Sequence, residues 1–196
     1  MIPLLPRLLP LLISALLTTV CLAHPLPEIP VDTDFDGKGG CTLRIEIDPR
    51  SFEEDPNTAP SLTNADLALL NAAGRDELKK KAAAYIARVV AWNFDPTGAF
   101  KPVFNFTFTS HENVELKNPE DVVVLTGTWS GPVPAGASGY SMEATPAGTL
   151  SVVIHHTARG EKVERFQVLF PGEKSYVLDL RTYLPRTAAP APITAP

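Results

Sequence analysis

The sequence predicts a mainly β protein: an antiparallel β-sandwich, Ig-like, with a two-helix insertion, α+β overall. About eight short segments alternate apolar and polar residues, which is typical of half-buried strands. At about 62–92 the apolar residues instead repeat every three or four positions, the period of a helix. Residues that favour turns separate the alternating segments at regular spacing, as in sandwich proteins.

Residues 1–23 are expected to form a cleavable signal peptide. Arg7 is their only charge, and the apolar run 8–17 precedes small residues that end at Ala23. Pro10 interrupts this run, which is shorter than the roughly 20 residues of a membrane span. We therefore expect an exported protein, periplasmic or extracellular, with no transmembrane segment after signal cleavage; a retained anchor is the less favoured alternative.

Residues 24–184 are predicted to form one β-sandwich domain, and 185–196 a disordered tail rich in Pro and Ala. The chain has two cysteines, and Cys21 would leave with the signal peptide. Cys41 therefore has no partner for an intrachain disulfide. It shares a strand phase with Leu43 and Ile45, which indicates a buried small hydrophobic residue. A reactive thiol is the alternative.

The first elements after the leader resemble a hairpin. Strands are predicted at 31–35 and 41–48, and the sequence between them, Asp-Gly-Lys-Gly-Gly, favours a turn. The polar residues of the second strand, among them Thr42 and Arg44, are expected on the face opposite to Leu43.

The helical insertion begins with a capping box, in which Asp66 lies three residues after Thr63. Gly74 is expected to end this first helix. A second helix is expected from about Arg75 to Trp92. Its apolar stripe should pack against the sheet, while the lysines at 79–81 face solvent; the stripe consists of Leu78, Ala82, Tyr85, Ile86 and Val89.

The period returns to two after this insertion. Strands are predicted at about 104–109, 121–129, 138–144, 149–157, 162–170 and 175–180. Phe106 and Val168 are expected in the core. Tight hairpins are predicted at 158–160 and at 171–174, because glycine occupies both positions where a turn must reverse the chain.

The charge of the chain disfavours nucleic acid as a partner. The formal net charge is −5, and the longest basic run is the three lysines at 79–81. An acidic surface repels a phosphate backbone.

Two metal-binding hypotheses follow from the motifs. Asp32, Asp34 and Asp36 precede Gly37 in the spacing of the first half of a calcium loop. Position twelve of that loop is Leu43 rather than a bidentate carboxylate, so a turn rich in Asp and Gly is the favoured interpretation.

The second hypothesis concerns copper or nickel. Cleavage after Ala23 would make His24 the first residue, where its α-amine and its imidazole together form a chelate for these metals. A second histidine would complete the site. His155 and His156 are adjacent in one predicted strand, so they point to opposite faces and at most one could join.

Catalytic motifs offer less. The sequence from Gly136 to Tyr140 resembles the elbow of a serine hydrolase, but its second glycine, Gly139, comes one residue early and no helix follows. A hydrolase is therefore the least favoured class, and we expect no catalytic residues. Asn105-Phe106-Thr107 is a glycosylation sequon.

Short motifs resemble the extracytoplasmic domains associated with nickel/cobalt permease proteins of the HupE/UreJ kind. They are Ala23-His24-Pro25-Leu26 after the leader, I-x-I-D-P at 45–49 and F-D-x-x-G at 94–98. The resemblance implies an extracytoplasmic companion of a metal transporter. We therefore expect an exported, non-enzymatic binding or accessory module whose partner is a membrane transporter or another envelope protein. A copper- or nickel-binding protein built on His24 is the alternative.

Overall fold

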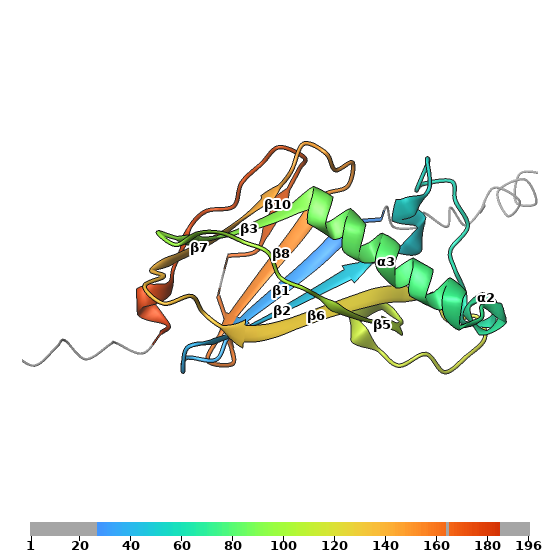
Figure 1. The fold of residues 1–196 in the computed structure, drawn as a ribbon, viewed down its shortest axis with the longest axis horizontal. Coiled ribbons are helices and arrows are strands. Elements are labelled where there is room, and N and C mark those ends of the chain that lie inside the picture. The colour runs from blue at the N-terminus through green and yellow to red at the C-terminus, as the bar shows by residue number, and fades with distance from the viewer. Residues whose placement is uncertain (1–26, 164, 185–196) are drawn as a thin grey trace, which may run out of the picture.

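The computed structural model describes residues 27–163 and 165–184, and these form two β-sheets with two α-helices (Figure 1). The predicted mainly β sandwich with a helical insertion is confirmed. The signal peptide predicted at 1–23, the candidate ligand His24 and the tail predicted at 185–196 lie outside the described residues.

The larger sheet has seven strands. Its main path runs β10-β8-β1-β2-β6-β5, and β9 pairs with β8. The strands are β1 (Ile29–Phe35), β2 (Gly40–Ile47), β5 (Asn105–Thr109), β6 (Val124–Pro132), β8 (Val152–Ala158), β9 (Glu161–Lys162) and β10 (Gln167–Leu169). β1 and β8 pair in parallel, which departs from the wholly antiparallel arrangement that we expected.

The predicted hairpin is confirmed as β1 and β2. Its turn is held by the carboxylate of Asp36, which accepts hydrogen bonds from the backbone N–H groups of Lys38 and Gly40. Alternation gives the sheet two different faces. Val31 and Leu43 are buried on the inner face, whereas Asp32 and Arg44 lie on the outer face.

The insertion consists of α2 (Asn64–Leu69) and α3 (Ala72–Val89). The capping box of Thr63 and Asp66 is confirmed. The role predicted for Gly74 is wrong: the side chain of Asn71 accepts a hydrogen bond from the Gly74 N–H and thereby caps α3, so Gly74 lies in the first turn of that helix. α3 continues directly into a strand, which contains Trp92.

The predicted stripe of α3 packs against the inner face. Ala82, Tyr85, Ile86 and Val89 are buried in the core, and Leu78 is partly buried against it. Figure 1 shows α3 running across the large sheet. In the described part of the chain, no helix has the length and apolar character needed to cross a membrane.

The smaller sheet also packs on the inner face. It has the order β11-β7-β3-β4 and comprises β3 (Val90–Asp95), β4 (Gly98–Phe100), β7 (Gly139–Ala144) and β11 (Leu178–Asp179). Tyr140 joins the two sheets: its ring lies 5.4 Å from that of Phe35, and its hydroxyl is 3.1 Å from the Thr33 hydroxyl. Phe94 packs on the same ring at 5.1 Å between centroids.

Cys41 is buried, as predicted, and forms no disulfide within the described part of the chain. Burial, with the nearby carboxylates of Asp34 and Asp36, raises the pKa of its thiol to about 12. A thiol of that pKa is protonated near neutral pH, so the reactive-thiol alternative is wrong.

The last strands differ most from prediction. The expected strand 162–170 is split between β9 and β10, and the expected strand 175–180 is reduced to β11. The turn at 158–160 joins β8 to β9 as predicted, but the strands on either side of 171–174 join different sheets, so no hairpin forms there. Val168, expected in the core, is 41% exposed because it points outward from the edge strand β10.

Three short 3-10 helices complete the described elements: η2 (Pro49–Phe52), η3 (His111–Asn113) and η4 (Leu180–Thr182). The first two lie next to the large sheet, since η2 follows β2 directly and η3 contacts β2.

Candidate functional site

Polar side chains form rows across the outer face of the large sheet, that is, the face opposite to α3 and the small sheet. Asp32 is the cross-strand neighbour of Arg44 on one side and of His155 on the other. Thr128 is the next neighbour of Arg44. We call this set the first row: His155, Asp32, Arg44 and Thr128.

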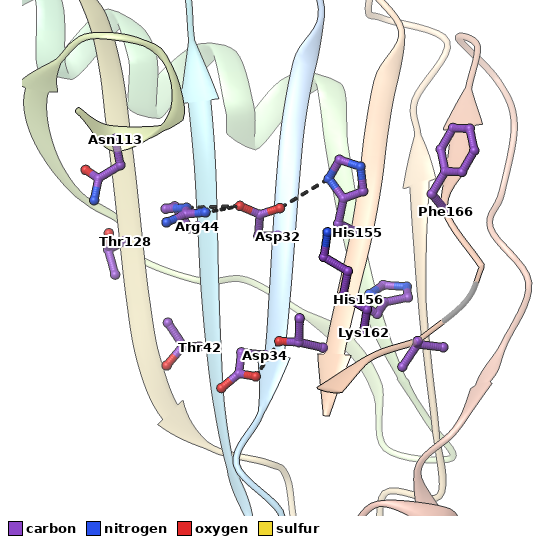
Figure 2. A pocket seen from close by; sticks show the side chains of 12 residues that line it. Asp32, Asp34, Thr42, Arg44, Asn113, Thr128, His155, His156, Lys162 and Phe166 are labelled. Atoms are coloured by element: carbon purple, nitrogen blue, oxygen red, sulfur yellow. Dashed lines mark hydrogen bonds and ion pairs between the residues drawn. The ribbon is translucent and has the colours of Figure 1, made fainter. Parts of the chain in front are cut away.

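Three members of the first row, His155, Asp32 and Arg44, are joined by hydrogen bonds (Figure 2). Arg44 donates from Nε to Oδ2 of Asp32 at 3.0 Å, and its Nη2 forms an ion pair with the same oxygen. Nδ1 of His155 lies 3.3 Å from Oδ1 of Asp32. An ionised carboxylate only accepts, so the Nδ1 of His155 carries the hydrogen and its Nε2 is left as an acceptor when the ring is neutral.

A second row lies two residues further along the same strands and consists of Thr157, Asp34, Thr42 and Ser130. The Thr157 hydroxyl donates to Asp34, and the hydroxyls of Thr42 and Ser130 are 3.0 Å apart. Asp34 and Thr42 are themselves cross-strand partners. The two rows therefore provide a polar floor whose groups already hold one another in place.

A hollow of about 1050 Å³ lies over this polar floor and is lined by residues of both rows. Asn113 from η3 bounds it on one side and Phe166 on the other (Figure 2), and Lys162 and Val163 also line it. A second hollow of about 690 Å³ shares Asp32, Arg44 and His155 with the first and extends towards Pro27, Glu46, Arg50 and His111.

The η3 segment has an unusual backbone. Glu112 and Asn113 both have φ near 58°, in the left-handed region, which costs roughly 1–2 kcal/mol for a residue with a side chain. The N–H of Glu112 donates to the carboxylate of Glu46 on β2 at 3.1 Å. This bond holds the strained turn against the outer face, and such strain is often retained where a site must be kept in shape.

The second hollow has an ion pair in its wall. Arg50 donates from Nε and Nη2 to Oδ2 of Asp48 at 2.8 and 2.6 Å, and both side chains are largely buried. Because removing one partner would leave the other as an unpaired buried charge, the pair is costly to break. It therefore holds η2 in a fixed position at the end of β2.

The first row contributes too little to the stability of the fold for a purely structural role. The side chains of Arg44 and Asp32 are 40% and 37% exposed, and pairs at that exposure contribute only about 0–1 kcal/mol to stability. The fold therefore depends little on the row, which leaves its side chains open to ligand.

This geometry brings Asp32, Asp34 and His155 together at the first hollow and turns the two histidine rings to opposite faces of β8. His155 is exposed on the outer face, whereas His156 is buried on the inner face beside Tyr140, with ring centroids 5.6 Å apart. Asp32 and Asp34 belong to the two rows, and Asp36 binds the backbone of the hairpin turn, which lowers its pKa.

The calcium-loop spacing thus runs along a strand into a turn, and each carboxylate has a separate set of partners. Within residues 27–163 and 165–184, no three His, Cys, Asp or Glu side chains are placed to bind one metal ion. His24 lies outside these residues, so the copper or nickel hypothesis stays a prediction.

The sequence interpretation did not single out Asn113, Phe166 or Thr128 as site residues. The sequence did indicate Arg44, because alternation placed it on the polar face of its strand. Phe166 falls within the predicted strand 162–170, but the structure splits that strand and leaves Phe166 between β9 and β10. η3 has no motif.

No protein-family model matches the chain, and no curated protein matches it.

Proposed function

We propose that this chain is an exported, non-enzymatic binding module whose ligand lies on the outer face of the large sheet. One observation carries the proposal: the two bonded rows form a polar floor beneath a hollow of about 1050 Å³. Ligand sites are concave and largely pre-formed, with a small number of oriented polar groups. The proposal of export is supported by the leader-like residues 1–23.

Binding is favoured over hydrolysis by the placement of the hydroxyl groups. A His–Asp pair such as His155 and Asp32 requires a nucleophile at the second ring nitrogen. The Thr157 and Thr42 hydroxyls are instead bonded within the second row. Thr128 lies two strands beyond Asp32.

The resemblance to domains of HupE/UreJ-type permease proteins extends the proposal to a partner. On that basis the module would serve a membrane transporter or another envelope protein. The paired charges of the outer face suit a polar ligand, and this is compatible with an accessory role outside the membrane.

The binding proposal is tested by a fragment screen on the ¹⁵N-labelled protein, read by NMR. We expect the largest amide shifts at Asp32, Arg44 and His155, because these side chains line both hollows. Thr128→Trp should abolish the shifts by filling the floor. The matched control Ala87→Trp, on the exposed side of α3, should leave them unchanged. Shifts that persist in Thr128→Trp, or that gather elsewhere, would contradict the proposal.

A second candidate function, copper or nickel binding, is favoured by one observation. Pro27 lines the second hollow together with His111 and His155. His24 precedes Pro27 by three residues, a stretch of chain that spans at most about 10 Å. If the leader is cleaved after Ala23, the terminal chelate could therefore reach these imidazoles.

Metal analysis of the exported protein tests this candidate. We expect near-stoichiometric copper or nickel by mass spectrometry, lost in His24→Ala and reduced in His155→Ala. A variant with one alanine added before His24 is the sharper control, since it keeps the imidazole and removes the terminal chelate. Protein that takes up neither metal on titration rules the candidate out.

A further inference from the structure

The first hollow has balanced charge. Its lining contains two carboxylates, Asp32 and Asp34, and two cations, Arg44 and Lys162. Asp32 is bonded to Arg44, and Asp34 accepts from Thr157. These formal charges cancel, so neither an anion nor a cation gains a net attraction from the lining, and an ionic group at Asp32 or Arg44 would have to break their pair. The hollow therefore favours an uncharged ligand.

The floor alternates hydrogen-bond donors and acceptors at close spacing. The guanidinium of Arg44 only donates, the carboxylate of Asp32 only accepts, and the amide of Asn113 does both. Neighbouring strands lie about 4.8 Å apart, so these groups can be reached by adjacent groups of one ligand. A hydroxyl both donates and accepts, and a ligand with several hydroxyls matches such a floor.

An aromatic ring stands at the rim of this floor. Phe166 is 68% exposed, and its ring centroid lies 6.3 Å from that of His155 at an interplanar angle of 32°. The face of a phenyl ring is electron-rich and attracts the weakly positive C–H groups of a ligand. A sugar ring presents C–H groups on its face and hydroxyls on its edge, so it can contact Phe166 and the floor together.

We infer that the outer face binds a neutral oligosaccharide, with Phe166 packing on one sugar ring and the first row binding its hydroxyls. This rests on the proposed binding function of the outer face. The volume of the first hollow, about 1050 Å³, has room for several sugar units rather than one.

Calorimetric titration tests the inference with neutral hexasaccharides of glucose, xylose, mannose and N-acetylglucosamine. Polygalacturonate and hexalysine serve as anionic and cationic probes. We expect saturable binding of at least one neutral probe. Phe166→Ala should weaken it by about threefold to tenfold, and Phe166→Trp should retain it.

Phe170→Ala is the matched control. Phe170 is 62% exposed and lies four residues from Phe166, at the other end of β10, but it does not line either hollow. It should leave the affinity unchanged. Equal losses in both variants, or binding of the charged probes alone, would overturn the inference.

The outcome also separates this inference from the function on which it rests. If fragments bind at the outer face and no neutral hexasaccharide does, the ligand class is wrong and the binding face stands. If neither binds, both proposals fail.

Discussion

Phe94→Ala is expected to lower the free energy of unfolding by about 3–5 kcal/mol, the usual cost of deleting a buried phenyl ring. Phe94 is fully buried, and its ring packs between Tyr140 at 5.1 Å and Phe100 at 5.5 Å. These contacts connect the small sheet to the large one, because Tyr140 in turn contacts Phe35 on β1. The loss should therefore affect the whole sandwich.

Urea denaturation followed by tryptophan fluorescence measures this effect, since Trp92 and Trp129 lie on different sheets. Phe170→Ala is the control, because an exposed ring should change stability by no more than about 0.5 kcal/mol. A loss below about 1 kcal/mol in Phe94→Ala would show that the two sheets do not share this aromatic core.

Acidification is expected to destabilise the protein through His156. Burial, with a smaller contribution from His155, lowers the pKa of the His156 imidazole from 6.5 to about 4. As the pH falls below 6.5 the unfolded chain takes up a proton that the folded state refuses, so stability decreases. The decrease continues to about pH 4 and amounts to about 3 kcal/mol.

Replacing His156 with phenylalanine should remove this part of the pH dependence. The site suits an aromatic ring, because Tyr140 and Tyr176 pack on the imidazole with centroids 5.6 and 6.1 Å away. The buried Nδ1 also lacks a hydrogen-bond partner among the described residues, so the substitution loses no bond from that atom.

The comparison requires unfolding measurements at pH 7 and pH 4.5 for the wild type, His156→Phe and His155→Gln. His155→Gln should keep most of the dependence, since burial of His156 is the larger cause. Identical slopes in the wild type and His156→Phe would show that the imidazole titrates normally in the folded protein.

Local patterns predicted the parts of the fold that depend on local interactions. The β1–β2 hairpin follows from alternation with a glycine-rich turn, and the capping box follows from the side chains of Thr63 and Asp66. Gly74 was misplaced because Asn71 offers a cap that begins a new helix at once. Tertiary packing of the α3 stripe then outweighs the low helix propensity of glycine.

Non-local pairing could not be predicted in this way. The parallel pairing of β1 with β8 joins residues more than a hundred positions apart, for example Asp32 and His155. Val168 was expected in the core as an aliphatic residue of the predicted strand 162–170, but it points to the outer side of an edge strand, which is open to solvent.

The candidate site combines both kinds of information. Alternation in β2 placed Arg44 on a polar face, and the adjacency of His155 and His156 placed them on opposite faces. The row itself depends on the register of three strands, which brings Asp32 between Arg44 and His155. Phe166 and Asn113 reach the hollow from segments whose path is set by tertiary contacts.

The position of β1 has a consequence for how the protein is made. β1 is synthesised before every other strand that the structure describes, yet it lies in the middle of the large sheet between β2 and β8. One edge of the β1–β2 hairpin therefore stays unpaired until the ribosome has added β8, more than a hundred residues later. Such long-range closure slows folding and leaves an exposed strand edge open to association with other chains. The growing chain therefore exposes that strand edge until its C-terminal third emerges.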